Sequence, residues 1–396
     1  MTRIAGIDIC KLSVVACILE ERPTEPRQSI YDETFYTFEA NVSGLQGLID
    51  LKPDIAIMEP TGVNYAKLWG TQLARLGVEV RLVGNDKLRN YALHSLQFQD
   101  KNDDYDAYAL ACYGFDYLDV SHRFLQERDQ VIVRIRQLVL RLAHLARVQS
   151  PIINRLRQDL AWQFPEIAAR QGKRVANCVP LFFAWLAGER SSKQYDRDYA
   201  NSCGLGLTDT VIEHAKRMCD IHREEMVIER ELTQLIADER FKPYRAIFSK
   251  FGFGQRVEAM ILSQIFPIES YMGEDGTPEV KMRKGRNSGK PTARHLSRRR
   301  FQKALGVAPS ENSSGDKEGR GVVGGSDLCR KALWQWVFTA IEPKKRRLSN
   351  GIMDRLGEKL DREKEQGRPV RLIRSRVSSK AGELLFKELV NEIIRK

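Results

Sequence analysis

The sequence predicts an α/β domain over residues 1–120, a helical region over residues 121–240 and a mainly α-helical domain over residues 241–396. Three observations predict this organisation. Short apolar runs separated by turn residues fill the first part, apolar residues at coiled-coil spacing fill the second, and a glycine-containing turn before an apolar helix opens the third. A chain of 396 residues is long enough for two or three separate cores.

The first 120 residues alternate predicted strands and helices. Apolar runs predict strands over 4–9 and 13–20, joined by a short turn, and then strands over 33–38, 55–58 and 78–83. Helical spacing of apolar residues predicts a helix over 65–76, which Gly77 ends. This order of elements is typical of an RNase H-like (RuvC-like) fold, although other α/β folds begin in the same way.

Two long helices are predicted in the middle of the chain. Apolar residues alternate steps of three and four, which is typical of a coiled-coil seam, at Ile135, Leu138, Leu142 and Leu145. Pro151 predicts a kink or a restart of this helix. A second apolar stripe predicts a helix over 210–237. The two helices would form an antiparallel pair, a dimer arm or part of an internal bundle.

A turn with two glycines opens the third region. Gly252 and Gly254 precede a predicted helix over 257–265. Such a turn can present backbone N–H groups at a helix N-terminus to a phosphate, as helix-hairpin-helix elements do. A simple tight turn is the alternative interpretation.

The residues from Lys281 to Lys303 include ten Lys and Arg and no Asp or Glu. This composition predicts a loop that is either merely solvated or ordered by contact with phosphates, and we favour the second interpretation. The net charge of +12 also favours a polyanionic partner, although a basic soluble enzyme would share it. The candidate phosphate-binding side chains are those of Lys281, Arg283, Lys284, Arg286, Arg298, Arg299 and Arg300.

The seven cysteines are scattered without the spacing of a metal site or an obvious disulfide framework. This usage predicts reduced thiols and a cytoplasmic protein. No apolar window approaches the length of a membrane span, so we expect no membrane partner.

Four carboxylates occur in the order that two-metal phosphoryl transfer needs. Asp8 interrupts an apolar strand, Glu59 ends another, and Asp103 and Asp106 share one face at the start of a predicted helix. A carboxylate inside an apolar strand is costly unless a cation compensates for it. Taken singly, each acid has a structural alternative: a helix cap, a surface position or an unusual buried acid. Together they predict a magnesium (Mg2+) site.

These acids lie in segments that resemble the three acidic motifs of the DEDD insertion-sequence transposases, which are relatives of the Piv-type DNA invertases. The matching segments are residues 6–8, 58–62 and 101–107. Residues 251–254 resemble the P-G-I-G hairpin of that family, residues 304–309 its A-x-x-G-L-x-P element and residues 312–315 its serine-glycine segment. Asn102 stands in place of the usual Thr, and the extra acid Asp104 beside Asp103 leaves two choices for the third carboxylate. Phe251 stands in place of Pro, and residues 281–303 look like an insertion.

The resemblance implies a DNA recombinase in which Asp8, Glu59, Asp103 and Asp106 bind Mg2+ and Ser314 forms a covalent bond with DNA. It also implies donor and target DNA, a guide noncoding RNA and a homo-oligomer, a dimer or tetramer, with composite sites. Delegating sequence choice to a guide RNA is consistent with a basic chain that lacks a recognisable DNA-reading motif. From composition alone, the segment around Ser314 would be a flexible polar loop.

Two other functions use the same residues differently. A metal-dependent endonuclease of the Holliday-junction-resolvase type would need the carboxylates and could dispense with Ser314. A non-catalytic nucleic-acid-binding protein would need neither. A covalent protein–DNA adduct would form only with the recombinase.

Overall fold

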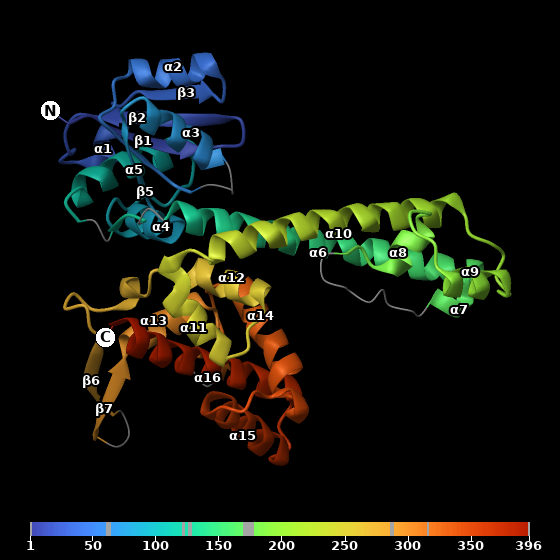
Figure 1. Cartoon of the computed structure of the whole chain (residues 1–396). Helices are drawn as coiled ribbons and strands as arrows, with labels where there is room; N and C mark the ends of the chain where they lie inside the picture. Colours follow the sequence, from blue (N-terminus) through green and yellow to red (C-terminus); the bar gives the residue numbers. More distant parts are fainter. Residues whose placement is uncertain are drawn as a thin grey trace. The chain divides into compact units, whose positions relative to one another are not determined.

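The computed structural model describes residues 2–60, 65–120, 123–125, 129–168, 178–285, 289–314 and 317–394 (Figure 1). For residues 311–314 and 317–320 it describes the backbone only. The chain divides into two compact units, Met1–Arg128 and Asp129–Lys396. Within the described ranges, none of the helices combines the length and the apolar character needed to cross a membrane.

Unit 1 is built on a mixed sheet of five strands in the order β3-β2-β1-β4-β5. Strand β1 is central, antiparallel to β2 and parallel to β4. Its residues from Ile4 to Ile7 are buried, which explains the continuous apolar run in the sequence. The strands are β1 (Ile4–Ile9), β2 (Ser13–Leu19), β3 (Phe35–Glu39), β4 (Ile55–Met58) and β5 (Glu79–Leu82).

Helices cover both faces of this sheet. Alternate residues of a strand point to opposite faces, and the two cores of unit 1 divide along this alternation. Ile4 belongs to the core formed with helices α4 and α5, whereas Ala5 and Ile7 belong to the core formed with α2 and α3. The helices are α1 (Pro26–Ser29), α2 (Val42–Asp50), α3 (Tyr65–Arg75), α4 (Asn85–His94) and α5 (Asp103–Tyr117).

Unit 2 begins with the antiparallel pair of long helices that was one of the predicted arrangements. Helix α6 (Gln130–Gln163) runs through Pro151 without a restart, and α10 (Asp209–Ile236) lies beside it (Figure 1). Two ion pairs set the antiparallel register, Arg134 with Glu231 at 2.6 Å and Arg141 with Glu224 at 2.5 Å. A separate small core joins the distal parts of both helices to α7 (Pro165–Ala168), α8 (Leu181–Leu186) and α9 (Lys193–Ala200).

The remainder of unit 2 is mainly helical and shares one core with the proximal parts of α6 and α10. Two short hairpins accompany it, β6 (Val280–Lys284) with β7 (Pro291–His295) and β8 (Ser310–Ser314) with β9 (Lys317–Gly321). The helical elements are η2 (Glu239–Phe241), α11 (Lys242–Lys250), α12 (Gln255–Ile265), η3 (Ile268–Tyr271), α13 (Leu296–Ala304), α14 (Asp327–Trp336), η4 (Val337–Ile341), η5 (Lys344–Arg346), α15 (Gly351–Glu365), α16 (Val370–Leu389) and η6 (Val390–Ile394).

Both hairpins correct predictions of loops. The basic segment from Lys281 forms most of the β6–β7 hairpin and the helix α13, and the segment that includes Ser314 forms strand β8. Composition misled the prediction because backbone hydrogen bonds, which do not depend on side-chain polarity, hold a two-stranded hairpin together. All residues of β6 and β7 are exposed, so these strands lack the apolar alternation that marks a half-buried strand.

Candidate active site

Asp8 lies on the face of β1 that α5 covers. Residues 4, 6, 8 and 10 share this face by the alternation of the strand, and Ile4 packs with α5 there. Asp8 is partly buried, as expected for a carboxylate near the end of a central strand. Cys10, which directly follows β1, falls on the same side of the chain as Asp8.

Glu59 is brought beside Asp8 by the pairing of two parallel strands. Met58, the last residue of β4, pairs with Ile7 of β1. Asp8 follows Ile7 and Glu59 follows Met58, so the two acids are neighbours across the strands. Parallel strands end at the same edge of a sheet, which places both carboxyl groups at that edge. This register explains why residues 51 positions apart in sequence interact.

Asp103 and Asp106 come from the first turn of α5. The N-cap of this helix is Asn102, whose side-chain oxygen accepts a hydrogen bond from the Tyr105 amide at 2.7 Å. The structural alternative for Asp103, a capping role, is therefore wrong. Both carboxylates are favoured near the positive end of the helix dipole.

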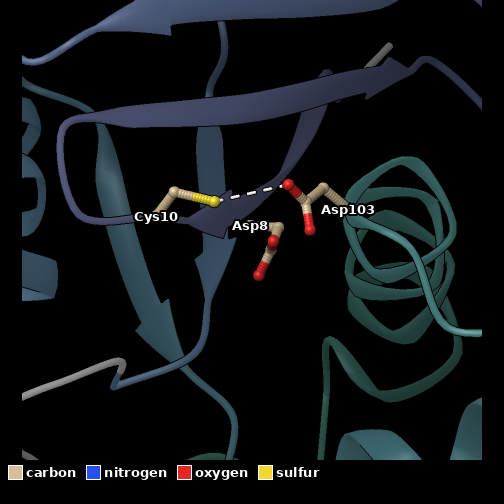
Figure 2. A group of neighbouring side chains, drawn as sticks. All are labelled: Asp8, Cys10 and Asp103. Carbon is tan, nitrogen blue, oxygen red and sulfur yellow. Dashed lines mark hydrogen bonds between the residues drawn. The ribbon is translucent and has the colours of Figure 1, made fainter.

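Three donor atoms lie close enough for one metal ion. One atom each from Asp8, Cys10 and Asp103 lies within 4.8 Å of the other two (Figure 2). The Cys10 thiol donates a hydrogen bond to Asp103 Oδ2 at 3.4 Å. Lys101 Nζ is 3.9 Å from Asp106 Oδ2 and supplies some opposing positive charge.

The electrostatics of these acids show that they share one environment. Burial, followed by the charges of Asp103 and Asp106, raises the pKa of Asp8 to about 6. Burial also raises the pKa of Glu59 to about 7, with Asp106 and Asp8 as the next causes. The pKa of Asp106 is raised as well, mainly by burial, although Lys101 opposes the shift. Desolvated and mutually repelling carboxylates are the arrangement that a divalent cation stabilises.

Cys10 belongs to this cluster although the spacing of the cysteines in the sequence does not indicate a metal site. The available signal was its position two residues after Asp8, which places both side chains on one face of a strand. Burial raises the pKa of the Cys10 thiol to about 11, with the hydrogen bond to Asp103 as the next cause.

The candidate nucleophile lies in unit 2. Ser314 is the last residue of β8, and its backbone pairs with Lys317 of β9. Its side chain lies outside the described part of the structure, as does Gly315. The backbone of Ser314 therefore belongs to the β8–β9 hairpin.

The candidate phosphate-binding residues divide into two sets. Arg298 pairs with Glu383 at 3.3 Å, and Arg300 pairs with Glu279 at 2.7 Å. Lys281 pairs with Glu279 as well, at 3.3 Å. Among the described residues, Arg283, Lys284 and Arg299 form no such ion pair, and their side chains are exposed, as are those of Lys281 and Arg300. Arg286 lies outside the described residues.

The two candidate glycines form the turn between α11 and α12. Gly252 has a φ of 60°, which favours glycine, and Gly254 is the N-cap residue of α12. Phe251 is buried, and its carbonyl accepts a hydrogen bond from Trp336 Nε1 at 3.0 Å. The turn is thus anchored to α14 by a backbone carbonyl, while the Phe251 side chain is buried in the core.

Comparison with known proteins matches two parts of the chain. Residues 5–165 match a transposase family model for DEDD enzymes of the IS110 type, and residues 289–350 match the model "Transposase IS116/IS110/IS902 family". The first match includes all four acids of the site, and the second includes Ser314. The matches together span more than half of the chain. A search of curated proteins found no match.

Proposed function

The chain belongs to the IS110 family of DEDD transposases, and on this premise we propose that it cuts and rejoins DNA with a Mg2+-binding acidic site and a nucleophilic serine. We further propose that unit 1 is an RNase H-like (RuvC-like) catalytic domain. The sheet order β3-β2-β1-β4-β5, with β1 antiparallel to β2 and parallel to β4, supports this assignment.

The observation that carries the proposal is the convergence of acids from three separate elements. Asp8 comes from β1, Glu59 follows β4, and Asp103 and Asp106 belong to α5. Their pKa values are raised mainly by burial, to which neighbouring carboxylates add, so that this environment disfavours their charged forms unless a cation is bound. Carboxylate oxygens are the ligands that Mg2+ prefers, so this donor set fits the ion. Bound Mg2+ would stabilise negative charge on the phosphate oxygens.

The role proposed for these residues depends on rigid placement. Strand pairing holds Asp8 and Glu59 side by side, and helix capping by Asn102 holds the first turn of α5. The four acids would orient the ion, while Lys101, at 3.9 Å from Asp106, limits their mutual repulsion.

Ser314 is the proposed nucleophile. Its hydroxyl oxygen forms a bond to the phosphorus of a phosphodiester, and the bond from phosphorus to one sugar oxygen breaks. The proton lost by the serine ends on that oxygen, which leaves as a sugar hydroxyl. In the rejoining step, the hydroxyl of another DNA end attacks the phosphorus and Ser314 regains a proton. The number of phosphodiester bonds is conserved, as a covalent intermediate allows.

The β6–β7 hairpin is the proposed phosphate-binding element. In the register of the two strands Lys281 lies opposite Arg294, and like charges opposite one another destabilise a hairpin, although Glu279 offsets part of the Lys281 charge. Arg283 lies two residues from Lys281 and therefore on the same face. A phosphate backbone would relieve this repulsion. The partners proposed are donor DNA, target DNA and a guide noncoding RNA, with the chain acting as a homo-oligomer.

Trapping a covalent adduct tests the proposal. The full chain is purified with its bound nucleic acid, which is sequenced to design the DNA substrate, and protein–DNA adducts are sought after denaturation. We expect an adduct with the unaltered protein and with Ser313→Ala, which changes a neighbouring residue of β8. Ser314→Ala should abolish the adduct and recombination while changing the free energy of unfolding by less than about 0.5 kcal/mol.

Other outcomes decide against parts of the mechanism. Free DNA ends without an adduct would identify a resolvase-type endonuclease. An adduct that survives Ser314→Ala but disappears in Ser313→Ala would show that the nucleophile is the other serine. Binding without cleavage, at any Mg2+ concentration, would leave a nucleic-acid-binding protein.

A further inference from the structure

We propose that Cys10 adds a sulfur ligand to the acidic site, so that thiophilic divalent ions bind through Asp8, Cys10 and Asp103 and compete with Mg2+. This inference rests on the proposed function, because it concerns the metal site of the proposed transposase. The carboxylates alone would not favour thiophilic ions over Mg2+, and Cys10 would supply that preference.

The placement of Cys10 follows from the backbone. It comes two residues after Asp8 and therefore lies on the same side of the strand, the side covered by α5. The Cys10 amide donates a hydrogen bond to the Ser13 carbonyl at 2.9 Å, which fixes the start of the β1–β2 turn. In Figure 2 the Cys10 thiol and the Asp103 carboxylate face each other from the end of β1 and the first turn of α5, and Asp8 lies beside them.

The distances suit a shared ion. In a tetrahedral site with a metal–sulfur bond near 2.3 Å and a metal–oxygen bond near 2.1 Å, the two donor atoms would be roughly 3.6 Å apart. Cys10 Sγ and Asp103 Oδ2 are 3.4 Å apart. Asp8 also offers an oxygen within 4.8 Å of the Cys10 sulfur and of an Asp103 carboxylate oxygen. One ion could therefore contact all three residues with small side-chain adjustments.

The donor set predicts selectivity. Mg2+ prefers oxygen ligands and would gain little from the sulfur, whereas softer ions such as Zn2+ and Cd2+ bind thiolates strongly. When the sulfur–metal bond forms, the thiol proton passes to the solvent. Thiophilic ions would thus gain a ligand that Mg2+ does not use, and would occupy Asp8 and Asp103 in its place.

The alternative role for Cys10 is structural, as a hydrogen-bond donor to Asp103. Cys10→Ser separates the two roles because serine keeps a hydroxyl donor and removes the sulfur. The other thiols also need control. Cys178 and Cys203 are exposed and would bind added metal, whereas Cys17, Cys112, Cys219 and Cys329 are buried. The reference protein should therefore be the full chain with Cys178→Ser and Cys203→Ser.

The experiment titrates Cd2+ into this reference protein and into the same protein with Cys10→Ser. The ultraviolet sulfur-to-cadmium charge-transfer band reports sulfur ligation directly. We expect the band in the reference protein only, and a Cd2+ affinity at least about tenfold lower after Cys10→Ser, since even outer-shell changes cost that much. Mg2+ affinity, from the rise in melting temperature, should be equal in both proteins.

The outcomes separate this inference from the proposed function. Equal charge-transfer bands and equal Cd2+ affinities in the two proteins would contradict the proposed role of Cys10. If Asp8→Asn still abolished the rise in melting temperature with Mg2+, the proposed Mg2+ site would remain supported. A Cys10-dependent band without any Mg2+ response would support the sulfur ligand and contradict the proposed Mg2+ site. An equal loss of Cd2+ and Mg2+ affinity after Cys10→Ser would assign Cys10 a structural role only.

Discussion

Gly6 and Ala107 bring strand β1 and helix α5 into direct backbone contact: a Cβ atom on Gly6 would lie 1.9 Å from the Ala107 carbonyl oxygen. No side chain fits in this space, so glycine permits α5 to lie directly on the strand. The contact is two residues from Asp8 and one residue from Asp106. The closeness of the acids therefore depends on the absence of a side chain at position 6.

Gly6→Ala should destabilise unit 1 by about 1–3 kcal/mol, the usual cost of overpacking, and should weaken Mg2+ binding by separating Asp8 from α5. Chemical denaturation of the full chain, with and without Mg2+, measures both effects. Gly70→Ala is the matched control. Gly70 lies within α3, and the nearest atom to an added Cβ is a Val80 side-chain carbon at 3.6 Å. Since alanine favours a helix over glycine, this control should be neutral or stabilising. Equal effects of both substitutions would mean that Gly6 does not set the position of α5.

Asp8→Asn should stabilise the metal-free protein by about 1–2 kcal/mol at pH 7.5 while abolishing strand cleavage, since it removes a half-buried repelled charge. Glu59→Gln should act in the same direction. Nucleic-acid binding should be retained in both variants. The measurement is the melting temperature across a Mg2+ titration, in which only the unaltered protein should respond. If Mg2+ raises the melting temperature of wild type and Asp8→Asn equally, the metal site is wrongly placed.

Neutralising the exposed hairpin should weaken nucleic-acid binding uniformly across sequences. Arg283→Gln with Arg294→Gln should lower the slope of log affinity against log salt concentration by up to about one unit per lost phosphate contact, without loss of stability. Arg298→Gln and Arg300→Gln serve as the comparison with the hairpin variant. The first removes the ion pair with Glu383 and the second removes the ion pair with Glu279. These two variants should affect folding as well as binding. An unchanged salt slope in the hairpin variant would reduce β6–β7 to a solvated hairpin.

The ion pair between Asp361 and Arg347 should make unit 2 sensitive to acid. Two hydrogen bonds of 2.8 Å join the Arg347 guanidinium to the Asp361 carboxylate. These hydrogen bonds are the main reason that the pKa of Asp361 is lowered. A lowered pKa in the folded state contributes stability above the unfolded pKa, and this contribution is lost as pH falls through the folded value. Asp361→Asn should therefore be less stable than wild type by about 1–3 kcal/mol at pH 7.

The difference in unfolding free energy between Asp361→Asn and wild type should shrink as pH falls below the ordinary pKa of an Asp, and it should close only below the lowered pKa of the folded state, where the wild-type carboxyl is protonated in both states. Urea denaturation at a series of pH values would show this convergence. Lys344→Ala is a useful comparison, because its Nζ lies 3.6 Å from Asp361 and is largely exposed, so its loss should cost less than about 1 kcal/mol. A pH-independent gap would indicate that packing, and not charge, explains the loss.

The sequence alone determined the features that depend on local pattern. Apolar runs predicted β4 at 55–58, and apolar spacing predicted the two long helices of unit 2. The segments around Asp8, Glu59 and Asp103, together with segments of the C-terminal region, resemble motifs of the transposase family, and this resemblance indicated the family. These features are readable because strand and helix periodicity records which side of an element is buried.

Tertiary structure decided the features that depend on long-range pairing. The pairing of Ile7 with Met58 places Glu59 beside Asp8, and the space left by Gly6 admits α5. Neither relationship is encoded by residues adjacent in sequence. The inclusion of Cys10 in the acidic cluster likewise required the position of Asp103 at the start of α5.

The hairpin that ends at Ser314 illustrates the same limit. Its sequence is polar and rich in glycine nearby, which predicts a loop, yet β8 pairs with β9 over five residues. Backbone hydrogen bonds form this pairing, and they leave no pattern in side-chain hydrophobicity. Local periodicity therefore determined which elements this chain forms, whereas contacts between distant segments decided which side chains meet, because a distance across the fold is set by packing and not by sequence spacing.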